Sequence, residues 1–257
     1  RNVPAQPVVG VRHLCIDIRD ADAVAQAINQ LQFDAVFHLA AMSNVAECER
    51  SPQRAIHTNV GGTRNVLSVV TPGTKCVLVS SCHVYGTPIQ LPITEGHPLA
   101  PKGVYAESKA AAERVAKEVC SNVVVIRAFH HTGPGQSPAY VLSDWANQIR
   151  HGETSLRVGN IDVRRDFTDV RDIVRGYVVA AEQGVQGETY NLCSGTSTPL
   201  RQALSMMIGT RPIQIEVVEA RLRKDDVADY CGDASKMNAL GWEPRIPLNQ
   251  TLMEMLG

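Results

Sequence analysis

The sequence predicts an α/β fold with a doubly wound parallel sheet, and three observations point to it. Short apolar runs alternate along the chain with longer segments of helical period, an order that is typical of βαβ units. The 257 residues are enough for one large domain with a smaller lobe. An apolar content of 44% and a charged content of 20% are ordinary for a globular protein.

The first half of the chain carries the predicted sheet domain, which we assign to residues 1–135. Its apolar runs predict strands at 11–18, 34–40, 76–80 and 123–127. Helices are expected at 21–31, capped by Asp20, from Pro52 to about residue 70, and at 105–119.

The second half, residues 136–257, is expected to be mainly a smaller substrate lobe that is interleaved with the end of the sheet. Helical periodicity predicts helices at 140–151, 170–182 and 200–208, and a last helix that begins near residue 248. Strands are expected near 156–158, 189–192 and 213–217.

Charge and cysteine content exclude several classes of protein. A net charge of −1 gives no indication of a nucleic-acid partner. The seven cysteines are scattered and contain no Cys-x-x-Cys pair, which favours reduced thiols in a cytoplasmic protein and argues against a disulfide framework or a metal site. No apolar stretch approaches 18 residues, so we expect no membrane association.

Ser81, Tyr105 and Lys109 form a candidate catalytic set. Ser81 ends an apolar run that reads as a parallel strand, and ligands bind at that end of open α/β sheets. Tyr105 and Lys109 are spaced i and i+4, which places them on one face of a helix. An adjacent ammonium lowers the pKa of a phenol, so the set suits proton transfer to a carbonyl. The alternative is an ordinary exposed helical pair.

A glycine-rich phosphate loop is missing from the start of the sequence. Dinucleotide-binding folds place such a loop in their first βα turn, and their second strand ends in an acidic residue. Here the first recognisable strand already ends near Asp17. We therefore expect that about forty residues, comprising the first βαβ segment, are lacking and that the sheet domain is N-terminally incomplete.

Further segments resemble the extended short-chain dehydrogenase/reductases, the NAD-dependent epimerase/dehydratase family that acts on nucleotide sugars, and the likeness is greatest to the GDP-4-keto-6-deoxy-mannose reductases. In the first half the matching segments are Asp17-Ile18, His38-Leu39-Ala40-Ala41, Asn59-Val60-Gly61-Gly62-Thr63 and the Ser81, Tyr105 and Lys109 set. In the second half they are residues 131–136, 158–160, 165–172, 190–195 and 241–248.

This resemblance implies a Rossmann-like fold, a Ser/Tyr/Lys mechanism and NAD or NADP as cofactor. The cofactor-binding residues that it implies are Asp17, Ile18, Leu39, Ala40, Ala41, Asn59, Tyr105 and Lys109. Whether the cofactor is NAD or NADP is left open.

Four residues are candidates for binding the substrate. The guanidinium groups of Arg165 and Arg223 match the phosphate oxygens of a nucleotide diphosphate, although Arg165 could instead belong to a solvated ion-pair loop. Asp226 is a candidate for the ribose. His130 stands where relatives usually carry a substrate-contacting Asn, and a structural histidine is the rival interpretation.

The leading functional hypothesis is NAD(P)H-dependent reduction of the 4-keto group of a GDP-linked 6-deoxy hexose. The 4,6-dehydratases of the family place an acidic residue directly after the catalytic Ser or Thr. Here Cys82 and His83 follow Ser81, which disfavours dehydration. One alternative is an NAD-dependent nucleotide-sugar 4-epimerase, and another is an inactive binding or scaffold protein that lacks the phosphate loop. The resemblance also implies a homodimer formed through the helices that carry Asn59 and Tyr105.

Overall fold

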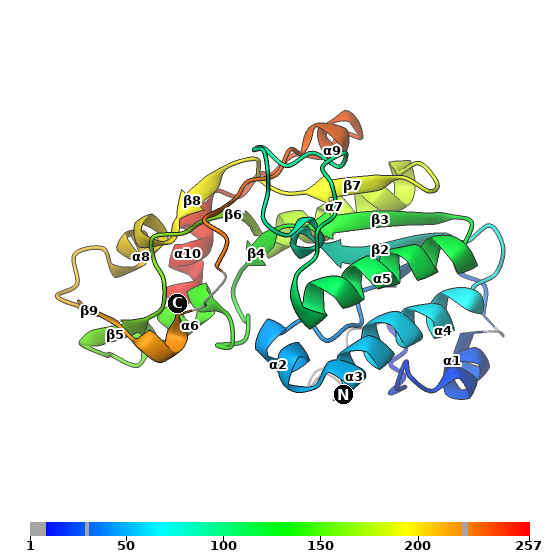
Figure 1. Cartoon of the computed structure of the whole chain (residues 1–257), viewed down its shortest axis with the longest axis horizontal. Helices are drawn as coiled ribbons and strands as arrows, with labels where there is room; N and C mark the ends of the chain where they lie inside the picture. The colour runs from blue at the N-terminus through cyan, green and yellow to red at the C-terminus, as the bar shows by residue number, and fades with distance from the viewer. Residues whose placement is uncertain (1–8, 29–30, 223–225) are drawn as a thin grey trace. The chain divides into compact units, whose positions relative to one another are not determined.

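The computed structural model describes residues 9–28, 31–222 and 226–257 of the chain (Figure 1). The chain divides into two compact units that are discontinuous in sequence. Unit 1 comprises residues 1–80, 102–125 and 186–188, and unit 2 comprises residues 81–101, 126–185 and 189–257. The predicted boundary after residue 135 stays a prediction.

Unit 1 is built from parallel strands covered by helices. Its elements are α1 (Ala21–Ile28), β1 (Ala35–His38), α2 (Val45–Arg50), α3 (Pro52–Ile56), the π-helical turn η1 (His57–Gly61), α4 (Gly62–Ser68), β2 (Lys75–Ser81), α5 (Gly103–Val119) and the first half of β3 (Val123–Ala128). Strands β1 and β2 pair in parallel, with Ala35 opposite Lys75. The four-stranded sheet has the order β1-β2-β3-β7, where β7 is Thr189–Leu192.

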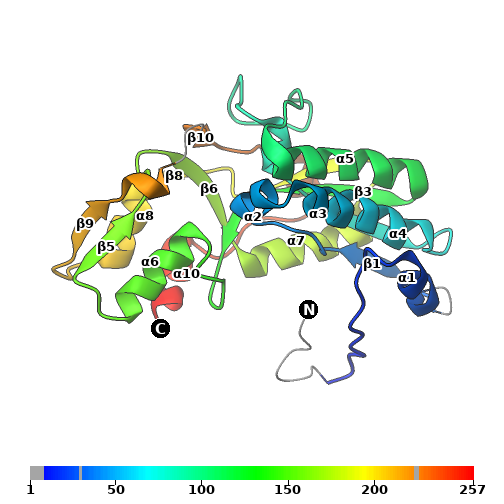
Figure 2. The ribbon, with the colours of Figure 1, turned by 60° about the horizontal axis from the view of Figure 1, so that its bottom comes forward.

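Helices α4 and α5 lie side by side in unit 1 (Figure 2). Their inward-facing residues, including Leu67 and Ala116, form one apolar core with Leu78 of β2 and Val125 of β3. Burial of these side chains is the main stabilising contribution to this half of the sheet. Since α5 carries the candidate Tyr105 and Lys109, the same packing fixes the position of both residues in unit 1.

Unit 2 contains two smaller sheets and the remaining helices. Its elements are η2 (Cys82–Tyr85), the second half of β3, β4 (His130–Thr132), α6 (Val141–Arg150), β5 (Ser155–Val158), β6 (Arg164–Asp169), α7 (Val170–Gln183), β7 (Thr189–Leu192), β8 (Ser197–Pro199), α8 (Leu200–Ile208), β9 (Gln214–Val217), η3 (Glu219–Arg221), β10 (Asp229–Tyr230), α9 (Ser235–Ala239) and α10 (Leu248–Leu256).

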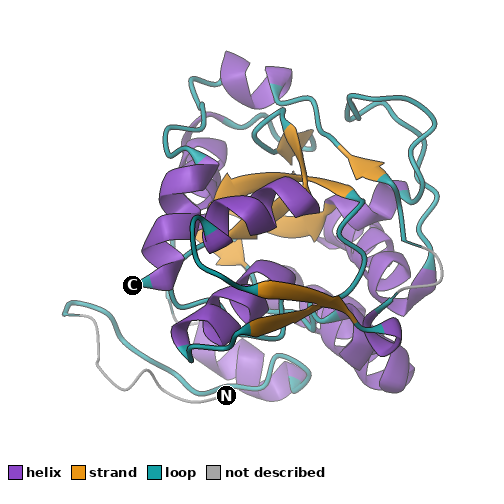
Figure 3. Ribbon diagram, turned by 90° about the vertical axis from the view of Figure 1, so that its left-hand side faces the viewer, coloured by secondary structure: helices purple, strands orange, loops and turns teal. Residues whose placement is uncertain are grey.

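The strands of unit 2 surround a second apolar core. Strands β10, β6 and β4 form one sheet, with β8 antiparallel to β6, and β5 pairs in parallel with β9. Figure 3 shows the chain from the side on which β5 and β9 lie in Figure 1, with its strands in orange. Trp145 of α6, Leu156 of β5, Met207 of α8 and Leu252 of α10 pack together in this core.

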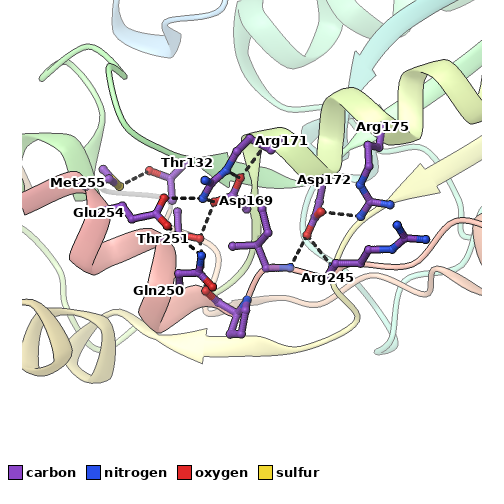
Figure 4. A network of polar contacts seen from close by, with 12 residues as sticks. Thr132, Asp169, Arg171, Asp172, Arg175, Arg245, Gln250, Thr251, Glu254 and Met255 are labelled. Atoms are coloured by element: carbon purple, nitrogen blue, oxygen red, sulfur yellow. Dashed lines mark hydrogen bonds and ion pairs between the residues drawn. The ribbon is translucent and has the colours of Figure 1, made fainter.

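Two buried aspartates at the start of α7 hold the C-terminal segment (Figure 4). Asp169 caps α7 by accepting from the Arg171 amide at 2.8 Å, and it accepts from the Thr251 hydroxyl of α10 at 2.7 Å. Asp172 accepts from the backbone amides of Arg245 and Ile246 at 2.7 and 2.8 Å. Both carboxylates are thereby paired inside the fold, which offsets the cost of burying them.

Most of the predicted elements are confirmed, because they carry their own local pattern. The helix predicted at 105–119 begins two residues earlier, at Gly103. The strand at 189–192 and the helix at 200–208 have the predicted bounds. The helix predicted from Pro52 continues to Ser68 and is interrupted by the π-helical turn η1.

The strand predicted at 11–18 is wrong. Residues 11–17 are irregular and pair with no strand among the described residues. Val11 and Leu14 are half exposed, so their apolar character does not reflect burial against a sheet. A strand depends on pairing for its hydrogen bonds, and the loose alternation of this segment could not reveal whether a partner exists. Within the part of the chain that the structure describes, no helix is long and apolar enough to span a membrane.

Candidate active site

Lys109 is buried in unit 1, on α5 one turn after Tyr105. Its side chain is 7% exposed, and its ammonium group donates a hydrogen bond to the backbone carbonyl of Val79 in β2. Burial lowers the pKa of Lys109 to about 8, although the carboxylate of Glu113 acts in the opposite direction. A lysine in this state can gain and lose a proton near neutral pH.

Tyr105 is half-buried at the start of the same helix. Its side chain packs against the apolar cluster formed by Met42, Cys48 and Ala55. The backbone carbonyl of Tyr105 accepts a hydrogen bond from the Ser108 hydroxyl at 2.8 Å. Helix α5 therefore presents Tyr105 and Lys109 on one face, as the i and i+4 spacing predicts.

Asn59 connects α5 to the loop after β1. Its side-chain oxygen accepts from the Met42 amide at 2.7 Å, and its Nδ2 donates to the Met42 carbonyl at 3.1 Å and to the Ser108 hydroxyl at 2.9 Å. Asn59 is almost fully buried and lies in the π-helical turn η1. Such turns are frequent at functional sites because they re-aim one side chain within a helix.

Contacts of Thr63 and Gly62 account for these two residues in the segment Asn59-Val60-Gly61-Gly62-Thr63. The Thr63 hydroxyl donates to the Asn59 carbonyl at 2.6 Å and lies 3.0 Å from His38 Nε2, at the end of β1. Burial and the nearby Lys109 lower the pKa of His38 to about 4, so its ring is neutral at pH 7. A Cβ on Gly62 would lie 2.4 Å from Ile18 Cδ1, and only glycine allows this approach.

The remaining predicted cofactor residues also lie in unit 1. Leu39 and Ala40 are exposed directly after β1, and Ala41 is half-buried. Asp17 is exposed and forms an ion pair with Arg19 at 2.5 Å, and the hydrogen bonds from Arg19 hold the pKa of Asp17 well below its usual range.

Ser81 lies at the end of β2 and belongs to unit 2. Its hydroxyl oxygen is 3.1 Å from His83 Nδ1 and accepts from the backbone amide of His83 at 3.3 Å. Cys82, between them, is buried, and this burial raises the pKa of its thiol to about 12. Cys82 is thus a protonated thiol at neutral pH and not a nucleophile.

A cluster of rings adjoins Ser81 in unit 2. The ring centroids of His83, His130 and Tyr230 lie 5.5 to 5.7 Å from one another. The Arg165 guanidinium lies over the Tyr230 ring at 5.5 Å, and it forms an ion pair with Asp226 at 2.5 Å. The predicted substrate residues His130, Arg165 and Asp226 are therefore joined through Tyr230, which the sequence did not single out.

A pocket of about 350 Å³ in unit 2 contains Arg165 and Asp226 in its wall. Arg221 and Asp144 also line it and form an ion pair at 2.5 Å. A Cβ on Gly159 would lie 2.7 Å from the Arg221 carbonyl, which explains the glycine in Val158-Gly159-Asn160. Arg221 was missed by the sequence analysis, and the predicted Arg223 lies outside the described residues.

Cys82, His83 and His130 place three potential metal-ligand atoms within 4.8 Å of one another. Metal-bound cysteine is a thiolate, whereas the Cys82 thiol holds its proton strongly. The prediction that the chain has no metal site stays a prediction.

Comparison with known proteins identifies the family. The family model described as GDP-mannose 4,6 dehydratase matches residues 10–255, nearly the whole chain. The chain belongs to this family. Membership confirms the resemblance that the sequence motifs predicted, and with it the parallel Rossmann-like α/β sheet.

A reductase and an epimerase are among the relatives. The chain is 33% identical to GDP-6-deoxy-D-mannose reductase of Pseudomonas aeruginosa, over 93% of this chain and 84% of the relative. The structure of RMD from Pseudomonas aeruginosa complexed with NADPH matches 100% of this chain and 90% of its own, with a TM-score of 0.84 and 32% identity. UDP-glucose 4-epimerase from Thermotoga maritima, solved with UDP-glucose, matches 94% of this chain and 82% of its own, with a TM-score of 0.82 and 26% identity.

Proposed function

We propose that this protein reduces the 4-keto group of a GDP-linked 6-deoxy hexose with NAD(P)H. The observation that carries the proposal is the buried Lys109 ammonium one turn from Tyr105, in a chain that is 33% identical to a GDP-6-deoxy-D-mannose reductase. An ammonium near a phenol favours the phenolate and so suits general acid catalysis on a carbonyl.

Tyr105 donates its phenolic proton to the carbonyl oxygen of the sugar in this mechanism. The charge of Lys109 stabilises the phenolate that forms as the proton leaves. Ser81 donates a hydrogen bond to the same carbonyl oxygen and holds it in place. The chemistry that NAD(P)H supplies when bound is a hydride for the carbonyl carbon.

The cofactor-binding residues fit a dinucleotide on the evidence of their own surroundings. Leu39 and Ala40 are exposed apolar residues at the carboxyl end of β1. Parallel sheets bind ligands at this end of their strands. Lys109 is held by Val79 and keeps further donors for ribose hydroxyls. We assign Asp17, Ile18, Ala41 and Asn59 to the same role, with Asp17 exchanging its Arg19 partner for the cofactor.

The nucleotide of the substrate is assigned to the pocket lined by Arg165 and Asp226. The Arg165 guanidinium donates to Asp226 and to the carbonyls of Arg164 and Val227, which fixes its position in the pocket wall. A planar guanidinium suits the diphosphate. We assign Asp226 to the ribose, His130 to the sugar diphosphate beside the rings, and Arg223 to the diphosphate.

A 4-epimerase is the second candidate, favoured by the match to UDP-glucose 4-epimerase of Thermotoga maritima. An epimerase keeps its NAD bound and consumes no net NADH. Absorbance of cofactor retained through purification, without net NADPH oxidation, separates it from a reductase. Calorimetry with NAD and NADP tests the third possibility, a binding or scaffold protein, because micromolar binding of either would argue against an inactive chain.

The experiment for the proposed function is incubation of the chain with GDP-4-keto-6-deoxy-mannose and NADPH. We expect NADPH oxidation in proportion to the sugar that is consumed. No oxidation by a chain that binds both NADPH and the sugar would contradict the proposal.

We also propose that the protein is a cytoplasmic homodimer that pairs through the segments bearing Asn59 and Tyr105. All seven cysteines are free thiols, which fits a reducing compartment. Light scattering of the purified chain gives its mass in solution, and the mass of a single chain would contradict the dimer.

A further inference from the structure

His83 makes two contacts with one oxygen atom, the hydroxyl of Ser81. The backbone amide of His83 donates to Ser81 Oγ at 3.3 Å, at the start of the short helix η2. His83 Nδ1 lies 3.1 Å from the same oxygen. Both contacts come from a residue that the proposed mechanism does not use.

The direction of the Nδ1 contact decides what Ser81 can do. A hydroxyl has one proton to donate and two lone pairs that accept. If Nδ1 carries no proton, it accepts the hydrogen bond that the Ser81 hydroxyl donates. Ser81 then has no proton left to donate to a carbonyl oxygen. If Nδ1 carries a proton, His83 fills both lone pairs of Ser81, and the Ser81 proton is free for the substrate.

We propose that His83 is a positioning residue whose protonated Nδ1 makes Ser81 a donor only. The proposal rests on the proposed function, because the Ser81 proton then goes to the carbonyl oxygen of the substrate. Hydrogen bonds in a chain polarise one another, so a donor on Ser81 Oγ also strengthens the bond that Ser81 makes to the carbonyl.

Two other rings and a thiol surround the His83 ring. The rings of His130 and Tyr230 flank it, each with a centroid 5.5 Å away. The Tyr230 hydroxyl donates to the Gly86 carbonyl at 2.9 Å, and burial raises the pKa of that phenol, so it stays neutral. Cys82 Sγ lies 3.8 Å from Nδ1, farther than the Ser81 oxygen.

The first test does not depend on activity. In the ¹⁵N-labelled chain at a pH where His83 is neutral, two-bond proton–nitrogen correlations show which ring nitrogen carries the proton. The His83→Asn spectrum assigns the signals by difference. We expect the proton on Nδ1. A proton on Nε2 alone would overturn the proposal even if the chain is an active reductase.

The second test separates positioning from a purely structural role. Asparagine places an amide N–H near the position of Nδ1, glutamine places one near Nε2, and leucine supplies neither. We expect H83Q and H83L to lower kcat about tenfold, the rate equivalent of one hydrogen bond, with little change in KM. H83N is expected to keep most of the activity, and His151→Asn, at an exposed histidine directly after α6, is the matched control.

Equal losses for Asn, Gln and Leu would overturn the proposal, as would a change confined to KM. A wild-type chain without reductase activity would count against the proposed function instead, and the tautomer measurement would still decide the direction of the hydrogen bond.

Discussion

Lys109 in unit 1 and Arg165 in unit 2 are both buried cations, but they are held in different ways. Lys109 donates to a backbone carbonyl, and burial brings its pKa down to about 8. Arg165 forms an ion pair with Asp226 and donates to two carbonyls. A guanidinium stays charged at any working pH, whereas a buried ammonium titrates.

The difference suggests that the two units have different roles, proton transfer in unit 1 and substrate binding in unit 2. A titratable lysine beside a tyrosine suits proton transfer, and a permanent charge in a pocket wall suits binding of a phosphate group. Substitutions in unit 1 should therefore act on kcat, and substitutions in the unit 2 pocket should act on substrate affinity. The following predictions are ordered by the size of the expected effect, whether on turnover, on affinity or on stability.

Tyr105→Phe should abolish most of the activity. It removes the proton donor but keeps the ring that packs against Met42, Cys48 and Ala55. We expect kcat to fall about 10²–10⁴-fold, the usual contribution of general acid–base catalysis. Steady-state kinetics measure the change in kcat, and calorimetry with NADPH measures any change in cofactor affinity. A tenfold loss of NADPH affinity with unchanged kcat would contradict the assignment of proton transfer to unit 1.

Arg165→Gln should weaken substrate binding about 30-fold, as expected when a charge-assisted contact to a diphosphate is lost. Turnover at saturating substrate should change much less. The matched control is Arg164→Gln, since Arg164 is the adjacent residue but is largely exposed and pairs with Asp229. Calorimetry with GDP gives the affinities. Equal losses for the two variants would contradict a specific role for Arg165.

The pH profile should show an alkaline limb that belongs to Lys109. Because burial lowers the pKa of Lys109 to about 8, the charge that stabilises the Tyr105 phenolate is lost above this pH. We expect kcat/KM to fall about tenfold per pH unit beyond the limb. Lys109→Arg should remove the limb, since arginine does not titrate there. If the alkaline decrease in kcat/KM is unchanged in Lys109→Arg, a group other than Lys109 causes it.

The same pKa has a consequence for stability, with a definite sign. Between pH 8 and the ordinary value of 10.5, the unfolded chain holds a proton on Lys109 that the folded chain has released. The contribution of Lys109 to the free energy of unfolding therefore rises with pH in this window. Urea titrations of the wild type and of Lys109→Met at pH 8 and pH 10 measure it as a difference between the two chains.

Asp172→Ala should change stability but not the turnover of folded molecules. The substitution leaves the amides of Arg245 and Ile246 without their acceptor and should cost about 3 kcal/mol. Asp162→Ala is the matched control, because Asp162 is 73% exposed and pairs with Arg201, which is also exposed; we expect no measurable shift in melting temperature there. Loss of kcat in well-folded Asp172→Ala would link the network of Figure 4 to catalysis.

The parts that could be predicted from sequence are those whose signal is local. Tyr105 and Lys109 share one helix, so their spacing alone predicts a common face. The helix at 200–208 carries a complete apolar stripe. The short helix α2 was missed because only six residues form it and its capping residue, Asn44, looked like part of a loop.

The parts that could not be predicted depend on contacts between distant segments. Arg221 and Asp144 form their ion pair across 77 residues of sequence, and no local pattern joins them. Tyr230 lies in a strand of two residues, too short to give a periodic signal. The strand predicted at 11–18 failed for the converse reason, since its residues alternate but pair with no described strand.

The most direct test of the proposed reduction is a single-turnover assay of the chain with GDP-4-keto-6-deoxy-mannose and NADPH that carries deuterium at the transferred position of the nicotinamide. The account predicts one deuterium at C4 of the sugar for each NADPH oxidised, with the reaction lost in Tyr105→Phe. A reduced sugar without deuterium at C4, or equal turnover by Tyr105→Phe, would contradict it.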